Sequence, residues 1–348
     1  MSYKPVFEVT RGAVVESVHF GAVAVADNSG RLHAWLGDHE TVTFLRSSAK
    51  PFQGLRLLES GAAAHYDLSS KQIAIICSSH SGTDEHVQEV ASIQNTIGVN
   101  EDDLLCGTHP PFHRETTTQL KQKGFEPTPN HHNCSGKHTG MLVLACFLDA
   151  PTTNYVDHQH LVQRLNLQVF AEMCGLDPTA VEVGVDGCSA PNFAVPLRAA
   201  ATAFARLVDP SGLAPDRAEA CRGVVNAMIS HPDMVAGPER FDTRIMEVAG
   251  GKLVAKGGAE GYQGIGILAG AIATESPALG VAIKISDGDL GCRARAPVTL
   301  AVLEALGALS DDQRAALIDF GPQPVTNYRG LIIGEARTCV RLERSVLR

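Results

Sequence analysis

The sequence has little that would place the protein on a nucleic acid or in a membrane. Its 29 Lys and Arg residues are outnumbered by 38 Asp and Glu residues, which gives a formal net charge of -9. Such a balance argues against a nucleic-acid-binding surface. No apolar run is long enough to span a bilayer, and residues 1–17 lack the basic start and apolar core of a signal peptide. We therefore expect no nucleic-acid partner and no membrane association.

The cysteines lack the density of a secreted disulfide scaffold. There are 9 of them, an odd number, and they are scattered over 348 residues. This pattern is typical of reduced thiols in a cytosolic protein, so we expect a cytoplasmic location. Any role of these cysteines is then packing, metal binding or catalysis.

The chain also lacks repeats, charge blocks and a Gly- or Pro-rich linker, so we expect one large domain spanning 1–348, or two closely joined lobes. Strand-like and helix-like runs are mixed along it, which predicts an α/β or α+β fold with a central sheet flanked by helices. The strand-like runs are 21–27, 71–79, 181–187, 252–258, 279–288 and 330–336. The helix-like runs are 49–63, 136–150, 160–175, 192–208 and 297–309.

One short motif, Ser47-x-x-Lys50 in "FLRSSAKPFQ", joins a hydroxyl to an amine. On a helix, residues three apart share a face, so the amine can reach the hydroxyl. A lysine serves as the base for a serine only in its neutral form, which burial or a nearby cation favours. A Ser-x-x-Lys match is expected about once by chance in a chain of this length, so a polar corner of a helix is the competing interpretation.

Two further stretches place small polar residues next to predicted strands. In "IICSSHSGTDEH", Ser78, Ser79 and a glycine follow an apolar run, and such residues let a backbone approach a ligand closely. The alternative is a helix N-cap at Ser81 or Thr83. In "KLVAKGGAEGYQG", Lys256 ends a strand before two glycines, which is also typical of a glycine-rich hairpin with a solvated lysine.

Two cysteine-containing stretches complete the set. In "NHHNCSGKHTGM", Cys134, Lys137 and His138 precede an apolar helix, and a thiol near a helix N-terminus and a lysine is reactive or ready to bind metal. A cysteine nucleophile, half of a metal site and a buried thiol at a helix start all remain open. In "VGVDGCSAPNFAVPL", Asp186 and Cys188 follow a strand, and we expect Pro191 to open a helix. Two loop cysteines can share a zinc ion, but standard finger spacing is absent.

The order of these motifs resembles the penicillin-recognising serine acyltransferases, although Ser-Asp-Asn and Lys-Thr-Gly are absent. A closer resemblance covers nearly the whole chain. The stretches "RSSAKPFQ", "CSSHSG", "HNCSGKHTGM", "DGCSAPNFAVPL", "MVAGPERFDT" and "KGGAEGYQGI" resemble the asparaginase II family of the Rhizobium type. The resemblance implies a serine β-lactamase/glutaminase-like fold, a homodimer and hydrolysis of L-asparagine to L-aspartate and ammonia.

The resemblance also implies roles for individual residues. Ser47 and Lys50 match one catalytic Ser-Lys tandem, and Ser79 with Lys256 matches the second. Cys134, Lys137 and Cys188 match a zinc site with one zinc ion per chain. That site lies next to the substrate and is bordered by Asp186 and His138.

We therefore expect an amidohydrolase in which a Ser-Lys tandem attacks the side-chain amide and forms an acyl-enzyme. Ser47 is the favoured nucleophile, with Ser79 and Lys256 completing a proton relay, although the sequence does not separate the two serines. Arg46 and Arg240 are candidates for the substrate α-carboxylate, and Asp186 for its α-ammonium group. The alternatives are a β-lactamase-like or peptidase-like serine hydrolase, and a non-catalytic zinc or amino-acid sensor.

Overall fold

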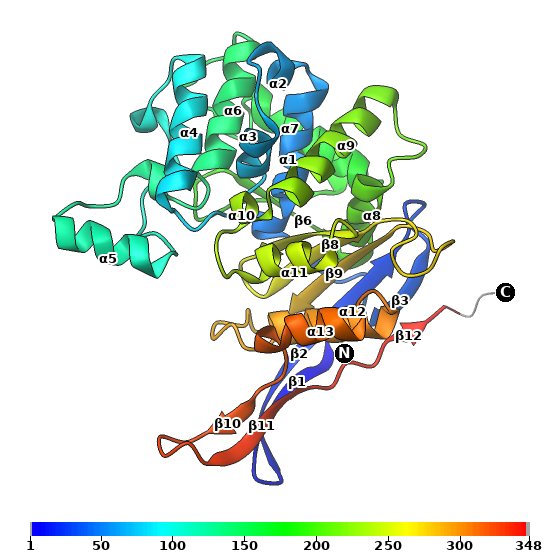
Figure 1. The fold of residues 1–348 in the computed structure, drawn as a ribbon. Coiled ribbons are helices and arrows are strands. Elements are labelled where there is room, and N and C mark those ends of the chain that lie inside the picture. The colour runs from blue at the N-terminus through cyan, green and yellow to red at the C-terminus, as the bar shows by residue number, and fades with distance from the viewer. Residues whose placement is uncertain (1, 346–348) are drawn as a thin grey trace. The chain divides into compact units, whose positions relative to one another are not determined.

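The computed structural model describes residues 2–345 of the chain. Strands and helices are mixed along it, which confirms the predicted α/β class (Figure 1). The contacts divide the chain into two compact units. The first comprises the described parts of 1–48, 195–209 and 248–348, and the second comprises 49–194 and 210–247. No helix within residues 2–345 has the length and apolar character needed to cross a bilayer.

The first unit is built on an antiparallel sheet with the order β10-β11-β1-β2-β9-β8-β7, in which β3 also pairs with β2, and β12 with β3. Its strands are β1 (Lys4–Arg11), β2 (Val14–Ala26), β3 (Leu32–Leu36), β7 (Leu253–Gly258), β8 (Tyr262–Ile267), β9 (Leu279–Ile285), β10 (Pro324–Thr326), β11 (Ile332–Thr338) and β12 (Glu343–Arg344). The short strand β4 (Val42–Phe44) and the 3-10 turn Arg46–Ala49 lead out of this unit. All residues of β8 and β9 are buried, so the middle of the sheet forms the core.

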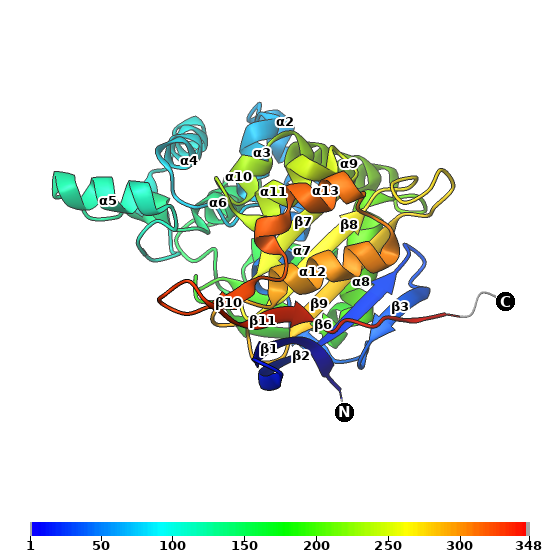
Figure 2. The same ribbon diagram turned by 60° about the horizontal axis from the view of Figure 1, so that its bottom comes forward.

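Helix α8 (Leu197–Val208) packs against β2, β8 and β9, and α12 (Arg295–Leu306) packs against β8, β9 and β11. Figure 2 shows α12 in front of the sheet and α8 behind it. Glycines permit the close approach of α8, because a Cβ at Gly280 would lie 1.8 Å from the carbonyl oxygen of Ala201. The remaining helices of this unit are α13 (Asp311–Ala316) and the 3-10 turn Ile318–Phe320.

The second unit is mainly helical. Its helices are α1 (Lys50–Glu59), α2 (Ala62–His65), α3 (Ser70–Ile76), α4 (Asp84–Ile97), α5 (Arg114–Lys123), α6 (Ser135–Phe147), α7 (Leu161–Cys174), α9 (Pro215–Ser230), α10 (Pro232–Val235) and α11 (Phe241–Ala249), the last reaching the unit boundary. Short 3-10 turns span Glu101–Asp103, Pro129–His131 and Pro178–Ala180, and β5 (Glu182–Val185) pairs with β6 (Pro191–Pro196). Helix α6 is buried from Ser135 to Ala145 and contacts α1, α2, α3, α4 and α7, so it is the centre of this unit.

Two sequence predictions about local structure are wrong. The run 71–79 was expected to be a strand, but its first part is helix α3, which Ser69 caps through a reciprocal capping box with Gln72. A short apolar run does not separate a strand from a buried helix by periodicity, and here the cap decides. Pro191 does not open a helix either: it begins β6, and α8 starts at Leu197. Cys188 therefore lies in the turn of a β-hairpin.

Candidate active site

Lys50 is the first residue of α1 and its side chain is buried. Pro51 follows it in the first helical turn, where the missing N–H of proline costs nothing. The Nζ atom of Lys50 lies 2.9 Å from Ser79 Oγ, 2.5 Å from the Ser78 carbonyl oxygen and 3.2 Å from the Asn133 carbonyl oxygen. Lys50 is thus held by three oxygens from two loops.

The loop that carries Ser79 is fixed between two capped helices. Helix α3 ends at Ile76, and Thr83 caps α4 through a capping box, so the N-cap offered as the alternative for this stretch is present at Thr83. The backbone N–H of Ser79 donates to the carbonyl of Val235 (2.9 Å). Helix α6 approaches this region closely, because a Cβ at Gly136 would lie 2.2 Å from the Ile75 carbonyl oxygen. The sequence therefore keeps Ser79 in one position beside Lys50.

This geometry suits proton transfer between an amine and a hydroxyl. A neutral amine at Lys50 has two hydrogens, which the carbonyls of Ser78 and Asn133 can accept, and its lone pair then faces Ser79 Oγ. A protonated amine can donate to all three oxygens. The neutral and the protonated amine can therefore both be held in this position without moving a heavy atom. Such a position suits a general base, which must gain and lose a proton in each cycle.

A second polar group lies at the start of α6. Lys137 Nζ donates to Cys188 Sγ at 2.9 Å, and both side chains are buried, as is that of Cys134. The hydrogen bond from the Cys188 thiol lowers the pKa of Cys134 well below its usual value; burial opposes this, and the ammonium groups of Lys50 and Lys137 add to it. Burial opposes the charge of Lys137, but the sulfur atoms of Cys188 and Cys134 outweigh it and raise the pKa of Lys137.

The other predicted site residues of the second unit are His138, Asp186 and Arg240, and the first two adjoin this group. Burial lowers the pKa of His138 to about 4, so its imidazole is neutral, and its Nδ1 lies 2.8 Å from the Tyr155 hydroxyl. Asp186 lies in the turn before Cys188 and its charge favours the ammonium form of Lys137. Arg240 Nη1 donates to Ser81 Oγ at 3.3 Å, and its guanidinium carbon lies 5.3 Å from the centre of the Phe112 ring.

The donor set of this group fits a zinc ion only if the lysine is a ligand. No group of three or more His, Cys, Asp or Glu side chains within residues 2–345 is placed to hold a metal ion. Cys134 and Cys188 would offer two sulfur ligands of the kind that zinc prefers, and Lys137 Nζ lies beside them. A three-ligand site of Cys134, Lys137 and Cys188 is thus chemically consistent with the structure.

The remaining predicted site residues belong to the first unit. Ser47 is half-buried in the 3-10 turn Arg46–Ala49, and Arg46 adopts a left-handed backbone conformation with φ 53°. Arg46 Nη1 lies 3.9 Å from Glu260 Oε1. Lys256 is fully buried on β7, and the carbonyl of Lys256 accepts a hydrogen bond from Ser48 Oγ at 2.5 Å.

The second unit therefore brings together two groups of predicted residues, Lys50 with Ser79 and Cys134 with Lys137 and Cys188.

The sequence predictions overlooked two residues with defined contacts, one in each unit. In the first unit, Ser48 was given no role, although its hydroxyl donates to the carbonyl of Lys256, 208 residues away along the chain. His80 stood in the quoted motif "CSSHSG" but was given no role, although it is fully buried.

A comparison with known protein families agrees with the family resemblance of the sequence motifs. A sequence model of the L-asparaginase II family matches residues 7–338, nearly the entire chain. No curated protein sequence matches the chain.

Distant likenesses were found among solved structures. A structure titled "Crystal Structure Analysis of Mglu" is 14% identical with a TM-score of 0.42, over 84% of this chain and 68% of that chain. A second Mglu structure, in its tris and glutamate form, has the same identity and TM-score over 84% and 60%. A Bacillus subtilis glutaminase, YbgJ, in covalent complex with 5-oxo-L-norleucine is 12% identical with a TM-score of 0.36, over 83% and 89%. At these TM-scores the likenesses add no argument to the family match.

Proposed function

Because the chain belongs to the L-asparaginase II family, we propose that it hydrolyses L-asparagine to L-aspartate and ammonia. The observation that best supports a Ser-Lys mechanism is the buried contact of Lys50 Nζ with Ser79 Oγ at 2.9 Å. A lysine surrounded by two carbonyls and a hydroxyl is held for proton exchange with that hydroxyl.

In the proposed mechanism, Ser47 is the nucleophile and Lys50, three residues later, is its base. Lys50 takes the Ser47 proton as Ser47 Oγ bonds to the side-chain carbonyl carbon of asparagine. The proton then passes from Lys50 through Ser79 to the amide nitrogen, the C–N bond breaks, and ammonia leaves. Water, deprotonated by the same relay in reverse, attacks the acyl-enzyme, and its proton returns to Ser47 as aspartate is released.

The second tandem and the substrate contacts are part of the same proposal. Lys256 supplies a buried cation that favours the neutral form of the catalytic lysine. Arg46 and Arg240 bind the α-carboxylate of the substrate, and Asp186 binds its α-ammonium group with His138 beside it. Backbone N–H groups near Ser47 or Ser79 stabilise the oxyanion.

Zinc, when bound, would be held by Cys134, Lys137 and Cys188 and would draw negative charge away from the two sulfur atoms. The chain's own residues then have separate duties. Lys137 must give up its proton to become a ligand, and Asp186 and His138 border the group.

We also propose that the protein is a homodimer. Apolar side chains are exposed where β1 turns into β2 and where β10 turns into β11 in the first unit. Val14 is 69% exposed, Leu331 51% and Ile332 72%. The backbone N–H of Gly12 donates to the Ile333 carbonyl, so these two turns adjoin one another. Adjacent exposed apolar side chains of this kind suit contact with another protein surface.

The experiment that tests the proposed function is an ammonia-release assay with L-asparagine and L-glutamine, run beside hydrolysis of a chromogenic β-lactam. The proposal predicts turnover of asparagine, with glutamine discriminated through the single extra methylene that separates the two substrates. Hydrolysis of the β-lactam without asparagine turnover would favour the β-lactamase-like alternative. Binding of asparagine or zinc without hydrolysis of any substrate would favour the sensor.

A further inference from the structure

His80 follows Ser79 directly and is fully buried, yet the proposed reaction gives it no part. The backbone N–H of Gly82 donates to its Nδ1 at 3.1 Å, so Nδ1 carries no proton. Its Nε2 lies 2.8 Å from Ser135 Oγ and must therefore carry the hydrogen and donate it. The hydrogen bonds thus specify one tautomer of a neutral imidazole.

Ser135 continues this chain of hydrogen bonds. Its hydroxyl accepts from His80 and donates to the carbonyl of Asn130 at 3.0 Å. Asn130 is held in turn by a reciprocal pair of side-chain hydrogen bonds with Gln94, at 2.8 and 3.2 Å. His80 is thus anchored to the segment 130–135, and that segment is anchored to helix α4.

Lys50 spans the same two segments. Its Nζ donates to the Ser78 carbonyl on the segment 78–82 and to the Asn133 carbonyl on the segment 130–135. The His80–Ser135 hydrogen bond is a direct side-chain link between these two segments, which also meet where Gly82 packs on the His131 carbonyl. The position of Ser79 Oγ relative to Lys50 Nζ depends on the separation of these two segments.

The surroundings of His80 keep it uncharged. Burial lowers the pKa of His80 well below its usual value, and the charges of His86, Lys50, His132 and His109 act in the same direction. The ring of His86 stacks on His80 with centroids 5.1 Å apart and an interplanar angle of 22°. A proton on Nδ1 would also point at the N–H of Gly82, so the cation would lose a hydrogen bond.

We propose that His80 is a positioning residue that, through its Nε2 hydrogen bond to Ser135, holds Ser79 Oγ within hydrogen-bonding distance of Lys50 Nζ. This inference rests on the proposed Ser-Lys function for its kinetic consequence. His80 acts through Ser79 and exchanges no proton with the substrate.

Side-chain replacements separate the two hydrogen bonds of His80. His80→Gln places an amide N–H near the position of Nε2 and retains the donor to Ser135. His80→Asn retains an acceptor for Gly82 but is too short to reach Ser135. We expect His80→Asn to lower kcat by about 10²-fold with KM changed by less than about threefold, because a small misplacement of reacting groups costs about this much. His80→Gln should restore most of kcat.

Ser135→Ala removes the other partner of the same hydrogen bond. It should lower kcat to a similar extent, and the double variant His80→Asn/Ser135→Ala should be no slower than either single variant, because the two changes break one link. Additive losses would overturn the proposal.

His160 offers a matched control. It is also buried, with Nδ1 accepting the Val162 N–H at 3.2 Å and Nε2 lying 2.9 Å from the Pro151 carbonyl oxygen. It caps helix α7, away from Ser79 in the chain. His160→Asn should lower the thermal midpoint by about as much as His80→Asn while leaving kcat of the folded protein unchanged.

A crystal structure of His80→Asn tests the inference without activity. The proposal predicts that the distance between Lys50 Nζ and Ser79 Oγ increases beyond about 3.5 Å, the limit of a hydrogen bond. An unchanged distance, or a wild-type kcat in His80→Asn, would overturn it. If the wild-type protein hydrolyses no amide, the proposed function fails, and the same distance measurement still decides the role of His80.

Discussion

Cys134 is the side chain that both polar groups of the second unit share. Its thiol interacts with Cys188 and Lys137 on one side and with Lys50 on the other. A change in the charge of Cys134 therefore alters the electrostatic potential at Lys50. The predicted zinc ligands and the predicted catalytic base are coupled through this interaction.

The first prediction concerns metal content. Protein never exposed to chelator should carry about one zinc ion per chain, and Cys134→Ser or Cys188→Ser should abolish binding, because each removes a thiolate ligand. Cys221→Ser is the control, since Cys221 is also buried but lies on α9. Metal analysis by mass spectrometry measures this. Absence of zinc from the wild-type protein would remove the claim.

The pH dependence of zinc affinity follows from the pKa of Lys137. That pKa is raised in the metal-free protein, so Lys137 is protonated and must release a proton to bind zinc. Affinity should therefore fall as pH falls, by about tenfold per pH unit for each proton released. Competition titrations with a chromogenic chelator between pH 6 and about 8 measure the slope. A slope of zero would show that Lys137 is not a ligand.

The sequence indicated candidate site residues only where a motif keeps them close along the chain. The pair Ser47-x-x-Lys50 was visible because three residues make one helical turn. The contact of Lys50 with Ser79 spans 29 residues, and no local sequence pattern predicts it. His80 had no visible signal, because its partners are a backbone N–H and a serine 55 residues away.

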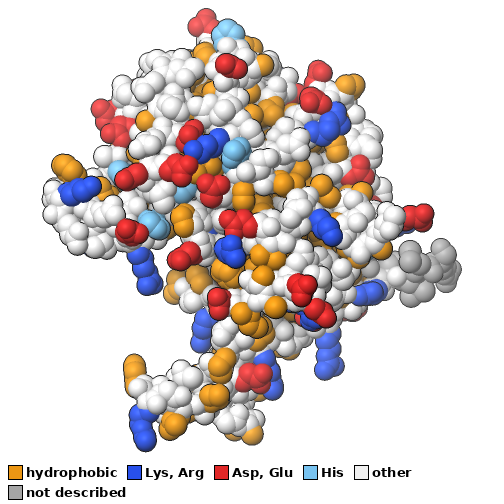
Figure 3. All heavy atoms as spheres, viewed as in Figure 1, with side chains coloured by type: hydrophobic (Ala, Val, Ile, Leu, Met, Phe, Trp, Pro, Cys, Tyr) orange, Lys and Arg blue, Asp and Glu red, His pale blue; other side chains and the backbone are white. Residues whose placement is uncertain are grey.

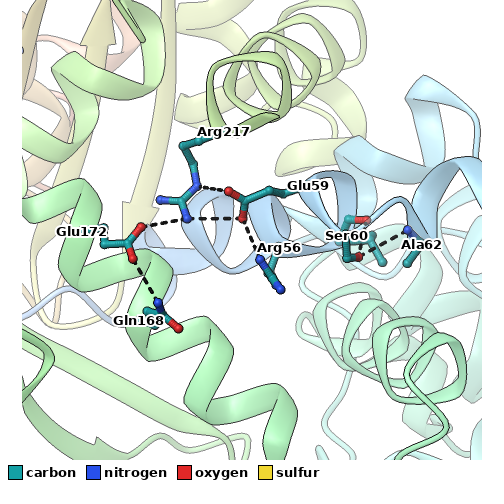
Figure 4. A network of polar contacts seen from close by, with 8 residues as sticks. Arg56, Glu59, Ser60, Ala62, Gln168, Glu172 and Arg217 are labelled. Carbon is teal, nitrogen blue, oxygen red and sulfur yellow. Dashed lines mark hydrogen bonds and ion pairs between the residues drawn. The ribbon is translucent and has the colours of Figure 1, made fainter. Parts of the chain in front are cut away.

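Helices α1, α7 and α9 are connected by a partly buried ion-pair network (Figure 4). Arg217 Nε donates to Glu59 Oε1 at 2.8 Å and Arg217 Nη2 to Glu172 Oε2 at 3.0 Å, while Arg56 Nη1 donates to Glu59 Oε2 at 3.3 Å. The side chains of Arg217 and Glu59 are 9% and 11% exposed. The network fixes α1, and Lys50 is the first residue of that helix.

Loss of Arg217 should therefore destabilise the fold. Arg217→Ala leaves Glu59 buried with only Arg56 as partner, and breaking a buried ion pair costs about 3–5 kcal/mol of unfolding free energy. Arg222→Ala, which removes an exposed pair with Glu219 on the same helix, should cost less than about 1 kcal/mol. Urea denaturation followed by circular dichroism measures both. Equal effects of the two variants would contradict the role given to the network.

Secondary structure was predictable from the long amphipathic runs, and the predictions failed for short runs. The runs at 136–150 and 160–175 became α6 and α7, and the run at 279–288 became β9. The run at 71–79 became α3 because Ser69 and Gln72 form a cap whose effect exceeds the strand propensity of the isoleucines. The segment 191–196 became β6 because it pairs with β5, a contact that periodicity does not reveal.

The order of strands in the first unit could not be predicted from the sequence. Strand β2 lies between β1 and β9, so segments more than 250 residues apart are paired, as between Val23 and Ile283. The mixed α/β class followed from the pattern of runs, but the pairing depends on side-chain packing across the sheet. Assembly likewise depends on surface residues far apart in the sequence.

The proposed homodimer is tested at the two adjoining turns of the first unit. Figure 3 shows hydrophobic side chains over the region of β10 and β11. A standard interface buries about 800 Å² per partner, and introducing a buried, unpaired charge disrupts it. Ile332→Asp combined with Val14→Asp should convert the dimer into a monomer in light-scattering chromatography. Ile318→Asp is the control, because Ile318 is 62% exposed and lies outside both turns. A dimer that survives the double variant would contradict the assignment of this surface.

The most direct test of the account is steady-state ammonia release from L-asparagine by the wild-type protein and by Lys50→Met, Ser47→Ala and Ser79→Ala. Lys71→Met serves as control, because Lys71 pairs with Glu85 and Glu89 on the surface of the second unit. We predict turnover by the wild type and the control, losses of about 10³-fold or more in kcat for each of the three variants, and no further loss in Lys50→Met/Ser79→Ala, because the residues act as one relay. Near-normal turnover by Lys50→Met, or no ammonia from the wild type, would contradict it.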